Sequence, residues 1–272
     1  MSSITSPSGP WGSPVGALCP LSTATAVGRL FGAQVEALHV GAERVALSTA
    51  ARKAGVNINN ASGEAVATLA AAASIEDVTA VVVGARGAHS GKRPAGSTAI
   101  GLITLQPRPV VVVPPDAPLR REIASVLVPL DGTATSAAAL AEIVELAHSA
   151  ALRIVIAHVH PPQALPAFSD HLPHEVRAWS EEFIARYCPS ARDASLELRV
   201  GEPHEHVLDI LRESGCDLVA LGWRQELARG HAPVVRRILA ETPVPVLLTP
   251  VGSDQMSSDV RAGEGLAGTM RS

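Results

Sequence analysis

The sequence predicts two α/β domains in tandem, each a doubly wound, five-stranded and mostly parallel sheet with helices on both faces. Three observations lead to this prediction. One series of apolar runs occurs twice in the same order. Within each series, runs of strand length alternate with alanine-rich segments of helical period. The runs are apolar on both faces, which is typical of parallel strands covered by helices on both sides.

Four pairs of segments carry the repeat. In chain order they are Ala17–Thr23 (ALCPLST) with Val126–Thr133 (VLVPLDGT), Ala37–Val40 with Ile156–Val159, Ala80–Gly87 with Leu218–Gln225, and Arg108–Pro115 with Val244–Pro250. The spacing between partners changes along the chain. We therefore expect the first copy to lack about ten residues after its first strand and about nineteen after its second. Its first helix would then hold only about three turns.

The elements are clearest in the second copy. Its expected strands are Ser125–Pro129, Arg153–His160, Leu196–Val200, Leu218–Leu221 and Val244–Thr249. Its expected helices are Ser136–Leu152, Leu172–Tyr187, Pro203–Ser214 and Pro233–Glu241. The first of these helices has a buried stripe at helical spacing, formed by Leu140, Ile143, Val144 and Ala147. The third opens with Pro203, which the first turn of a helix tolerates.

The domain boundaries follow from these elements. Residues 1–14 are expected to be a disordered segment, 15–116 the first domain, 122–250 the second domain, and 251–272 a disordered tail. The last strand of each copy is flanked by prolines, as is typical of a sheet edge, and a bare apolar edge invites pairing. We therefore expect the two domains to pair through their terminal strands within one chain. A homodimer stays open as a further assembly.

Composition excludes several classes of protein. A net charge of −4 gives no general attraction to nucleic acid or to an acidic membrane surface. The longest apolar runs are far shorter than the roughly 20 residues that span a bilayer. The first 14 residues lack the basic start and apolar stretch of a secretory signal. Cys19, Cys188 and Cys216 form neither a disulfide framework nor a zinc spacing. We expect a cytoplasmic protein.

A glycine-rich loop follows the fourth strand of the first copy. Val81–Thr98 reads VVVGARGAHSGKRPAGST; its glycines let backbone N–H groups turn toward an anion, and the helix start at Ser97 adds partial positive charge. Ligands of doubly wound sheets bind at this end of the strands. The loop matches neither GxxxxGK[ST] nor GxGxxG, which excludes P-loop NTPases and dinucleotide-binding Rossmann domains. The residues alone leave two interpretations equal: a phosphate cradle, or a plain strand-to-helix connection.

Together with the turn Asp131-Gly132-Thr133 after the first strand of the second copy, this loop resembles the universal stress protein family. Nucleotide-binding members of that family carry G-x2-G-x9-G-[ST] at this place. Gly84, Gly87, Gly96 and Ser97 fit that pattern with one spacer residue missing. The resemblance covers nearly all of both copies. It implies the fold of the adenine nucleotide α-hydrolases.

The resemblance also implies a ligand and its site. In binding members, ATP lies across the carboxyl edge of the sheet, and Mg²⁺ stays open as its companion. In the first copy the residues so assigned to adenine nucleotide are Pro20, Leu21, Ser22, Val40, Gly84, Arg86, Gly87, Gly96, Ser97 and Thr98. In the second copy they are Pro129, Leu130, Asp131, Val159 and Gly222.

The two copies depart from the family pattern in complementary ways. The first keeps the glycine loop but has Ser22 where the second has Asp131. The second keeps the aspartate, but Gln225 replaces the second glycine and no Gly-Ser pair opens the helix. Without those glycines, close approach of the backbone to a triphosphate is sterically costly. We therefore expect ATP mainly in the first copy, and no ligand or a smaller one in the second.

The resulting hypothesis is a ligand-sensing or stress-response module that is not an enzyme. No G-x-S-x-G elbow and no Ser/His/Asp or Cys/His set stands out, and Asp131 is the only carboxylate expected at the ligand edge. Two alternatives stay open: a nucleotide-free scaffold that acts through the surface of its paired domains, and a slow nucleotide hydrolase.

Several other residues have more than one interpretation. His158 and His160 share one face of a strand, but no spacing typical of zinc ligands accompanies them, so we expect surface histidines and no metal. Cys19 is expected in a strand as a core residue, and Cys216 is expected to be partly exposed. Trp223 either fills the ligand space of the second copy or is a surface aromatic; both interpretations stay open.

Overall fold

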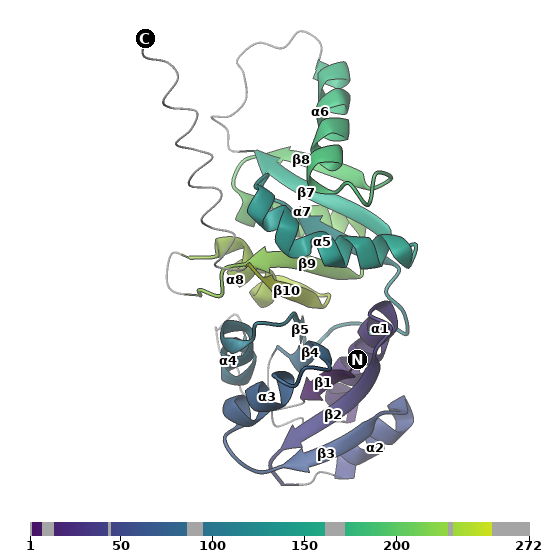
Figure 1. Ribbon diagram of the computed structural model, residues 1–272, viewed down its shortest axis with the longest axis vertical. Helices are drawn as coiled ribbons and strands as arrows, with labels where there is room; N and C mark the ends of the chain where they lie inside the picture. The colour runs from purple at the N-terminus through teal and green to yellow at the C-terminus, as the bar shows by residue number, and fades with distance from the viewer. Residues whose placement is uncertain are drawn as a thin grey trace.

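Strands and helices alternate along the part of the chain that a computed structural model describes, residues 2–6, 14–42, 45–85, 95–160, 172–227 and 231–251 (Figure 1). The first half contains β1 (Ser2–Ser6), α1 (Pro14–Leu30), β2 (Gln34–Val40), α2 (Val45–Ala54), β3 (Asn57–Ala61), α3 (Ala65–Ala73), β4 (Val78–Gly84), α4 (Ser97–Leu105) and β5 (Val110–Val113). The second half contains β6 (Ser125–Pro129), α5 (Ala134–Ser149), β7 (Arg153–His160), α6 (Leu172–Tyr187), β8 (Ser195–Val200), α7 (Pro203–Ser214), β9 (Leu218–Trp223), α8 (Pro233–Glu241) and β10 (Val246–Pro250).

The ten described strands form one sheet. Its order is β3-β2-β1-β4-β5-β10-β9-β6-β7-β8, so each half has the doubly wound order with a reversal between its first and fourth strands. Neighbouring strands within each half run parallel. The halves meet where β5 and β10 pair antiparallel, with Val112 opposite Val246 and Val110 opposite Leu248. The predicted doubly wound α/β fold is confirmed.

Helices cover both faces of this sheet, and each large core runs through both halves. Helices α3, α4, α7 and α8 pack on one face, in a cluster that includes Val112 of β5 and Leu248 of β10. Helices α1, α5 and α6 pack on the other face, in a cluster that includes Val111 and Leu247. Helix α2 packs against α1 and β2 in a smaller cluster. The antiparallel junction between the halves is therefore buried on both faces, like the parallel strands on either side of it.

The second half closely matches the elements expected from its sequence. Helices α6, α7 and α8 and strands β6 and β7 have the predicted bounds. The stripe on α5 is buried, with Leu140, Ile143, Val144 and Ala147 at most 3% exposed. Of the expected tail, residues 252–272 lie outside the described residues.

The start of the first half differs from the prediction. Ala17–Thr23 lies inside the 17-residue helix α1. The expected first strand, the short first helix and the placement of Cys19 in a strand are therefore wrong. The first strand is β1, which lies between β2 and β4, so the expected disorder of residues 1–14 is wrong for Ser2–Ser6.

Burial of α1 explains the difference. Leu21, Ala24 and Val27 are 0% exposed and lie at the spacing of one helical face. Their burial holds Pro20 inside the helix, although a proline there removes a backbone hydrogen bond. Strand β1, by contrast, has the largely polar sequence SSITS, which no apolar run marks.

Strand pairing also corrects the expected deletion. Thr5 of β1 pairs with Ala37, 32 residues further on, and Val128 of β6 pairs with Ile156, 28 residues further on. The first connection is thus four residues longer in the first half than in the second, where the sequence comparison predicted about ten fewer.

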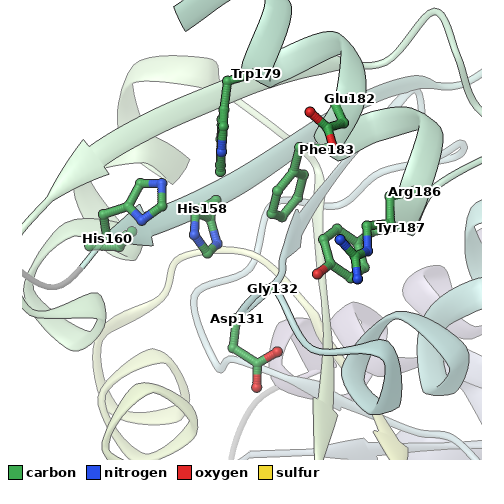
Figure 2. Close-up of a pocket in the computed structure, with 10 residues that line it drawn as sticks. Asp131, Gly132, His158, His160, Trp179, Glu182, Phe183, Arg186 and Tyr187 are labelled. Carbon is green, nitrogen blue, oxygen red and sulfur yellow. The ribbon is translucent and has the colours of Figure 1, made fainter. Parts of the chain in front are cut away.

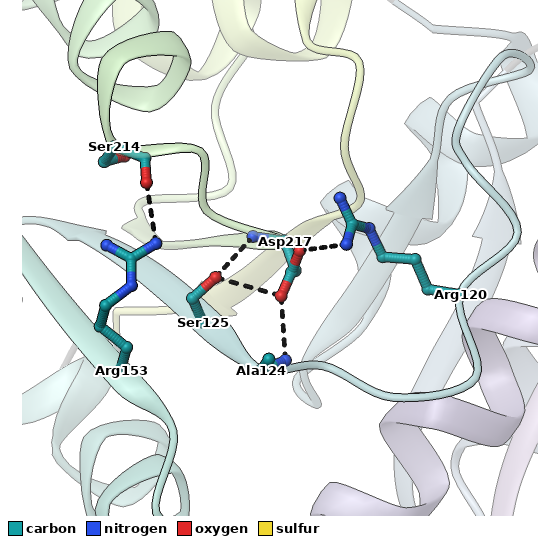
Figure 3. A network of polar contacts seen from close by, with 6 residues as sticks. All are labelled: Arg120, Ala124, Ser125, Arg153, Ser214 and Asp217. Carbon is teal, nitrogen blue, oxygen red and sulfur yellow. Dashed lines mark hydrogen bonds and ion pairs between the residues drawn. The ribbon is translucent and has the colours of Figure 1, made fainter.

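A polar network fixes the linker between the halves (Figure 3). The buried carboxylate of Asp217, just before β9, accepts hydrogen bonds from the N–H of Ala124 (3.0 Å) and the hydroxyl of Ser125 (3.1 Å). It also forms an ion pair with Arg120 at 2.5 Å. The carbonyl of Arg120 accepts a 2.7 Å hydrogen bond from Ser22 on α1. The linker is thereby tied to α1 on one side and to the start of β9 on the other.

Removal of the central carboxylate should destabilise the protein. We expect Asp217→Ala to lower the free energy of unfolding by about 2–3 kcal/mol, because it leaves buried donors without an acceptor. Asp209→Ala is the control: its ion pair with Arg212 is exposed on both sides and should contribute less than about 0.5 kcal/mol. Urea unfolding followed by circular dichroism measures both changes. Equal losses would show that Asp217 does not hold the linker.

The thiols should be unreactive in the folded protein. Cys19, Cys188 and Cys216 are at most 5% exposed, so the expected partial exposure of Cys216 is wrong. Burial raises the pKa of the Cys188 thiol to about 11, and burial together with the charge of Asp116 raises the pKa of Cys19. At pH 8 we expect Ellman's reagent to modify all three at least about a hundredfold more slowly in native protein than in denaturant. One rapidly modified thiol in native protein would contradict this burial.

Candidate functional site

A cavity of about 630 Å³ opens at the carboxyl ends of β6, β7 and β9 in the second half. The strand order reverses between β6 and β9, and ligands of doubly wound sheets bind at such a reversal. The N-termini of α7 and α8 complete the wall, through Pro203 and Pro233 among others. The volume lies within the roughly 300–1,000 Å³ typical of small-molecule sites.

The structure brings together the residues that the sequence assigns to the second copy. All five line this cavity: Pro129, Leu130, Asp131, Val159 and Gly222. Leu130 and Val159 are buried and give the cavity an apolar wall, whereas Asp131 is exposed. The site therefore combines apolar surface with a carboxylate at its mouth.

Asp131 is held as a carboxylate in a fixed orientation. Its Oδ1 accepts hydrogen bonds from the N–H (3.0 Å) and hydroxyl (2.8 Å) of Thr133, and a short hydrogen bond from the hydroxyl of Ser136. Burial of the carboxyl would raise the pKa of Asp131, but these hydrogen bonds outweigh it and lower the pKa below its usual value. All three bonds reach Oδ1, so Oδ2 can accept a hydrogen bond from a ligand hydroxyl.

The start of α8 offers a reduced set of donors to a phosphate. Its cap residue, Ala232, makes no side-chain hydrogen bond, which leaves the first-turn N–H groups available. Pro233 at the first helical position has no N–H, so one of these donors is missing. The anion-binding capacity of this helix end is therefore lower than that of a helix without proline.

Charge in the cavity is mixed. Asp131, Glu202 and Glu226 contribute carboxylates, and Arg224 contributes a guanidinium. Oε2 of Glu226 lies 3.4 Å from Nδ1 of His231, which also lines the cavity. Because like charges repel most strongly where water is partly excluded, this lining disfavours a polyphosphate more than a nucleoside or a single phosphate.

Gln225, which replaces a glycine of the family pattern, keeps the backbone conformation of a glycine. Its φ is +56°, a left-handed conformation that costs a residue with a side chain about 1–2 kcal/mol. Its side-chain amide donates to the carbonyls of Gln106 (2.6 Å) and Ile103 (3.4 Å), at the C-terminal end of α4 in the first half. The loop after β9 is thus attached to the other half of the molecule.

Five of the ten residues assigned to the first copy gather at the equivalent edge of the first half. They are Val40 at the end of β2, Gly84 at the end of β4, and Gly96, Ser97 and Thr98 at the start of α4. The loop between β4 and α4 is closed by a 2.6 Å hydrogen bond from the N–H of Gly96 to the carbonyl of Ala85. Gly96 caps α4 without a side-chain bond, so the first-turn N–H groups are available to an anion. Arg86 and Gly87 lie outside the described residues.

Three of the assigned residues lie elsewhere. Pro20, Leu21 and Ser22 are inside α1, so their expected place after the first strand is wrong. Leu21 is 0% exposed, and the hydroxyl of Ser22 bonds the linker. Burial of the apolar face of α1 puts these residues into the core and its rim, away from the strand ends.

The first-half counterpart of Asp131 is a different residue. Strands β1 and β6 have the same length, and their first residues pair with the first residues of β2 and β7, Ser2 with Gln34 and Ser125 with Arg153. Six residues on from Ser125 is Asp131, and six residues on from Ser2 is Ser8. Ser8 lies outside the described residues, but a hydroxyl residue replaces the carboxylate at this position of the sequence.

Two aromatic side chains next to this edge are buried, and the sequence predicted burial for neither of them alone: it left Trp223 open between two interpretations and placed His158 at the surface. Trp223 is 3% exposed and lines the cavity, so the interpretation as a surface aromatic is wrong. His158 is 6% exposed, so it is not the surface histidine that we expected. Its Nδ1–H donates to the carbonyl of Leu130 (2.7 Å) and supports the turn before Asp131. The available signal was their position: both lie on strands whose two faces are apolar.

Within the described ranges, no three His, Cys, Asp or Glu residues are grouped so as to hold a metal ion. None of the helices described here combines the length and the apolar character that crossing a bilayer requires.

Two solved structures share this architecture over nearly the full chain. A universal stress protein from Archaeoglobus fulgidus DSM 4304 is 16% identical, with a TM-score of 0.59 over 92% of this chain and 98% of that chain. The functionally unknown protein PA1789 from Pseudomonas aeruginosa PAO1 is 13% identical, with a TM-score of 0.64 over 97% of each chain. At these identities the likeness shows the fold alone.

Shorter matches and the family model complete the comparison. A universal stress protein in complex with cAMP is 19% identical over 48% of this chain and 98% of that chain, with a TM-score of 0.35, too low to transfer its ligand. No curated protein matches the chain. The model of the universal stress protein family matches twice, at residues 18–114 and 122–250. Because these two matches cover most of its length, the chain belongs to the universal stress protein family and carries the family domain in tandem.

Proposed function

We propose that this chain is a nucleotide-binding module for stress response or sensing, and that the second half holds an adenine nucleoside or nucleoside monophosphate. The observation that carries the proposal is the convergence of the five predicted second-copy residues on one cavity of about 630 Å³. A planar base would lie against the apolar wall formed by residues such as Leu130 and Val159. A ribose hydroxyl would donate to Oδ2 of Asp131, as ribose hydroxyls do to acidic residues in other doubly wound sheets.

The limit to a nucleoside or a single phosphate has three supports. Pro233 removes a donor from the start of α8, and the carboxylates of Glu202 and Glu226 line the same cavity. In addition, the side chain of Gln225 occupies the loop position where the family pattern has a glycine. The triphosphate chain of ATP would therefore find fewer donors and more negative charge here than in the family pattern.

ATP, with Mg²⁺ as its companion, remains the proposal for the first half. The loop after β4 carries three basic residues, Arg86, Lys92 and Arg93. Helix α4 opens at Ser97 without a proline, so its first turn keeps every backbone N–H. The sequence interpretation placed the nucleotide mainly here; the geometry of the described residues supports the nucleoside part of a site more strongly in the second half.

The proposed role is binding, not catalysis. We infer binding because Oδ1 of Asp131 is engaged by the Thr133 and Ser136 hydroxyls of its own turn. A ligand would act by ordering the loops at the sheet edge and so changing the surface that partners meet. A cytoplasmic location and a homodimer belong to the same proposal. The alternative is a nucleotide-free scaffold, which predicts no binding in either half.

The carboxylate at the cavity mouth gives the main test. We expect Asp131→Ala to weaken adenosine binding about ten- to a hundredfold, because a hydrogen bond to a charged acceptor contributes about 1.5–3 kcal/mol. Isothermal titration calorimetry measures the affinity and the number of sites. Asp131→Asn is the structural control, since it keeps an oxygen for the bonds from Thr133 and Ser136.

Gly87→Val, in the first-half loop, is the matched variant for that test. It should leave adenosine binding unchanged and weaken ATP binding at the first half. If Gly87→Val abolishes adenosine binding while Asp131→Ala has no effect, the nucleoside lies in the first half. Absence of any binding by the parent protein would support the scaffold.

Restoring the missing glycine tests the limit on phosphate. We expect Gln225→Gly to raise the affinity for ATP relative to adenosine several-fold, since glycine adopts a φ of +56° without strain and removes the side chain. Gln225→Ala is the control, because it loses the same contacts to α4 without restoring the glycine. If both variants change the affinity for ATP relative to adenosine equally, the lost contacts with α4 cause the effect. That result would count against the argument that glycine at this position favours a phosphate chain.

A further inference from the structure

A second cavity of about 350 Å³ lies between α6 and the end of β7, on the other face of the sheet from the large cavity (Figure 2). The chain has only three Trp, three Phe and one Tyr. Three of these seven, Trp179, Phe183 and Tyr187, recur every four residues on α6 and line this cavity. They face His158 and His160 of β7. An aromatic-poor protein thus concentrates its aromatic rings at one place.

Core packing accounts for only part of this cluster. Phe183 is 5% exposed and joins the core, with ring centroids 4.7 Å from His158 and 5.0 Å from Trp179. Trp179, Tyr187 and His160 are partly buried: the rings of Trp179 and Tyr187 pack against the core, and all three residues line the cavity. Packing on β7 does not require the ring surface that they leave at the cavity, because only burial stabilises apolar side chains. The accessible parts of these rings form an aromatic wall that a planar molecule can stack on.

The polar groups of the cavity include hydrogen-bond acceptors in fixed positions. The Nδ1–H of His158 donates to the carbonyl of Leu130 at 2.7 Å, so the ring's acceptor is Nε2, which has no hydrogen bond to another described residue. Gly132 leaves room for the ring: it has φ +80°, and a Cβ there would lie only 3.1 Å from Cε1 of His158. The carboxylate of Asp131 also lines the cavity.

Positive charge is confined to the rim. Arg186 is exposed, and its guanidinium lies over the ring of Tyr187, 5.5 Å from the centroid. Burial, together with the neighbouring His158, lowers the pKa of His160, so that ring is neutral at neutral pH. The inner surface therefore offers aromatic faces and hydrogen-bond acceptors. A flat ring that carries N–H donors is complementary to this surface.

We propose that this cavity is a second binding site, for a planar heteroaromatic ring that carries amino groups. The ring stacks on Trp179 beside Phe183, and its N–H groups donate to Nε2 of His158 and to Asp131. The site is separate from the nucleoside cavity, although Asp131 and Val159 line both. It does not depend on the function proposed above.

Tryptophan fluorescence tests the two cavities separately, because each has one tryptophan in its lining. Trp11→Phe with Trp223→Phe leaves Trp179 as the reporter of the aromatic cavity; Trp11→Phe with Trp179→Phe leaves Trp223 as the reporter of the large one. The probes are adenine and purine, which differ only in the amino group. We expect adenine to quench Trp179 saturably and purine to bind about tenfold more weakly. His158→Phe keeps an aromatic ring at this position but removes the acceptor Nε2. It should weaken the binding of adenine by about tenfold and leave the binding of purine unchanged.

The outcomes separate this inference from the proposed nucleoside site. Quenching of Trp179 supports the aromatic site whatever Trp223 does. No saturable change at Trp179, a change confined to Trp223, equal affinities for adenine and purine, or an unaffected His158→Phe variant would each overturn it. If Trp223→Phe fails to fold, the parent protein labelled with 5-fluorotryptophan gives the same readout by ¹⁹F NMR, with the Trp179 signal assigned through Trp179→Phe.

Discussion

The antiparallel pairing of β5 with β10 is the interaction on which the rest of the structure depends. It turns two five-stranded sheets into one sheet of ten strands and leaves neither apolar terminal strand as a free edge. Successive residues of these strands enter the two cores alternately: Val112 and Leu248 pack on one side, Val111 and Leu247 on the other. Both cores consequently pass through the junction, and the halves share their apolar burial instead of meeting through a separate, more polar domain interface.

The same pairing decides where the two candidate nucleotide sites lie. Because β5 and β10 run in opposite directions, the carboxyl ends of the strands in one half lie beside the amino ends of the strands in the other. The edge after β9 therefore meets the end of α4 that precedes β5, which is where Gln225 bonds Gln106. Gly84 and Gly96, the described ends of the first-half loop, lie at the opposite edge. The two ligands that we propose would therefore bind at opposite edges of the sheet.

How far the sequence predicts this molecule depends on how apolar each segment is. Every element boundary of the second half was predicted to within about three residues, because buried runs such as Arg153–His160 alternate with clear helices. The prediction was wrong at the start of the first half. The strand SSITS has no apolar run that would mark it, and the segment ALCPLST has the apolar content of a strand although its residues lie in a helix with a buried apolar face. The place of Asp131 at the sheet edge was predictable because it follows an apolar strand directly, whereas its assignment to a ligand came from the resemblance to the family. The aromatic cavity was not, since it needs contacts between β7 and α6 that spacing along the chain does not reveal.

The difference between the loops after β4 and β9 is connected with the shared sheet. Glycine adopts a left-handed φ without strain, so the loop after β9 needs another reason to carry a residue with a side chain there. In this chain the loop after β9 lies against the end of α4, whose last carbonyls need donors. Gln225 supplies one, and in doing so accepts a left-handed φ that a glycine would adopt freely. The side chain of Gln225 thus stabilises the contact between the halves, and in our proposal the same side chain leaves less space for a phosphate chain. The limit to a smaller ligand that we propose for the second half therefore depends on one residue at the junction of the two family domains.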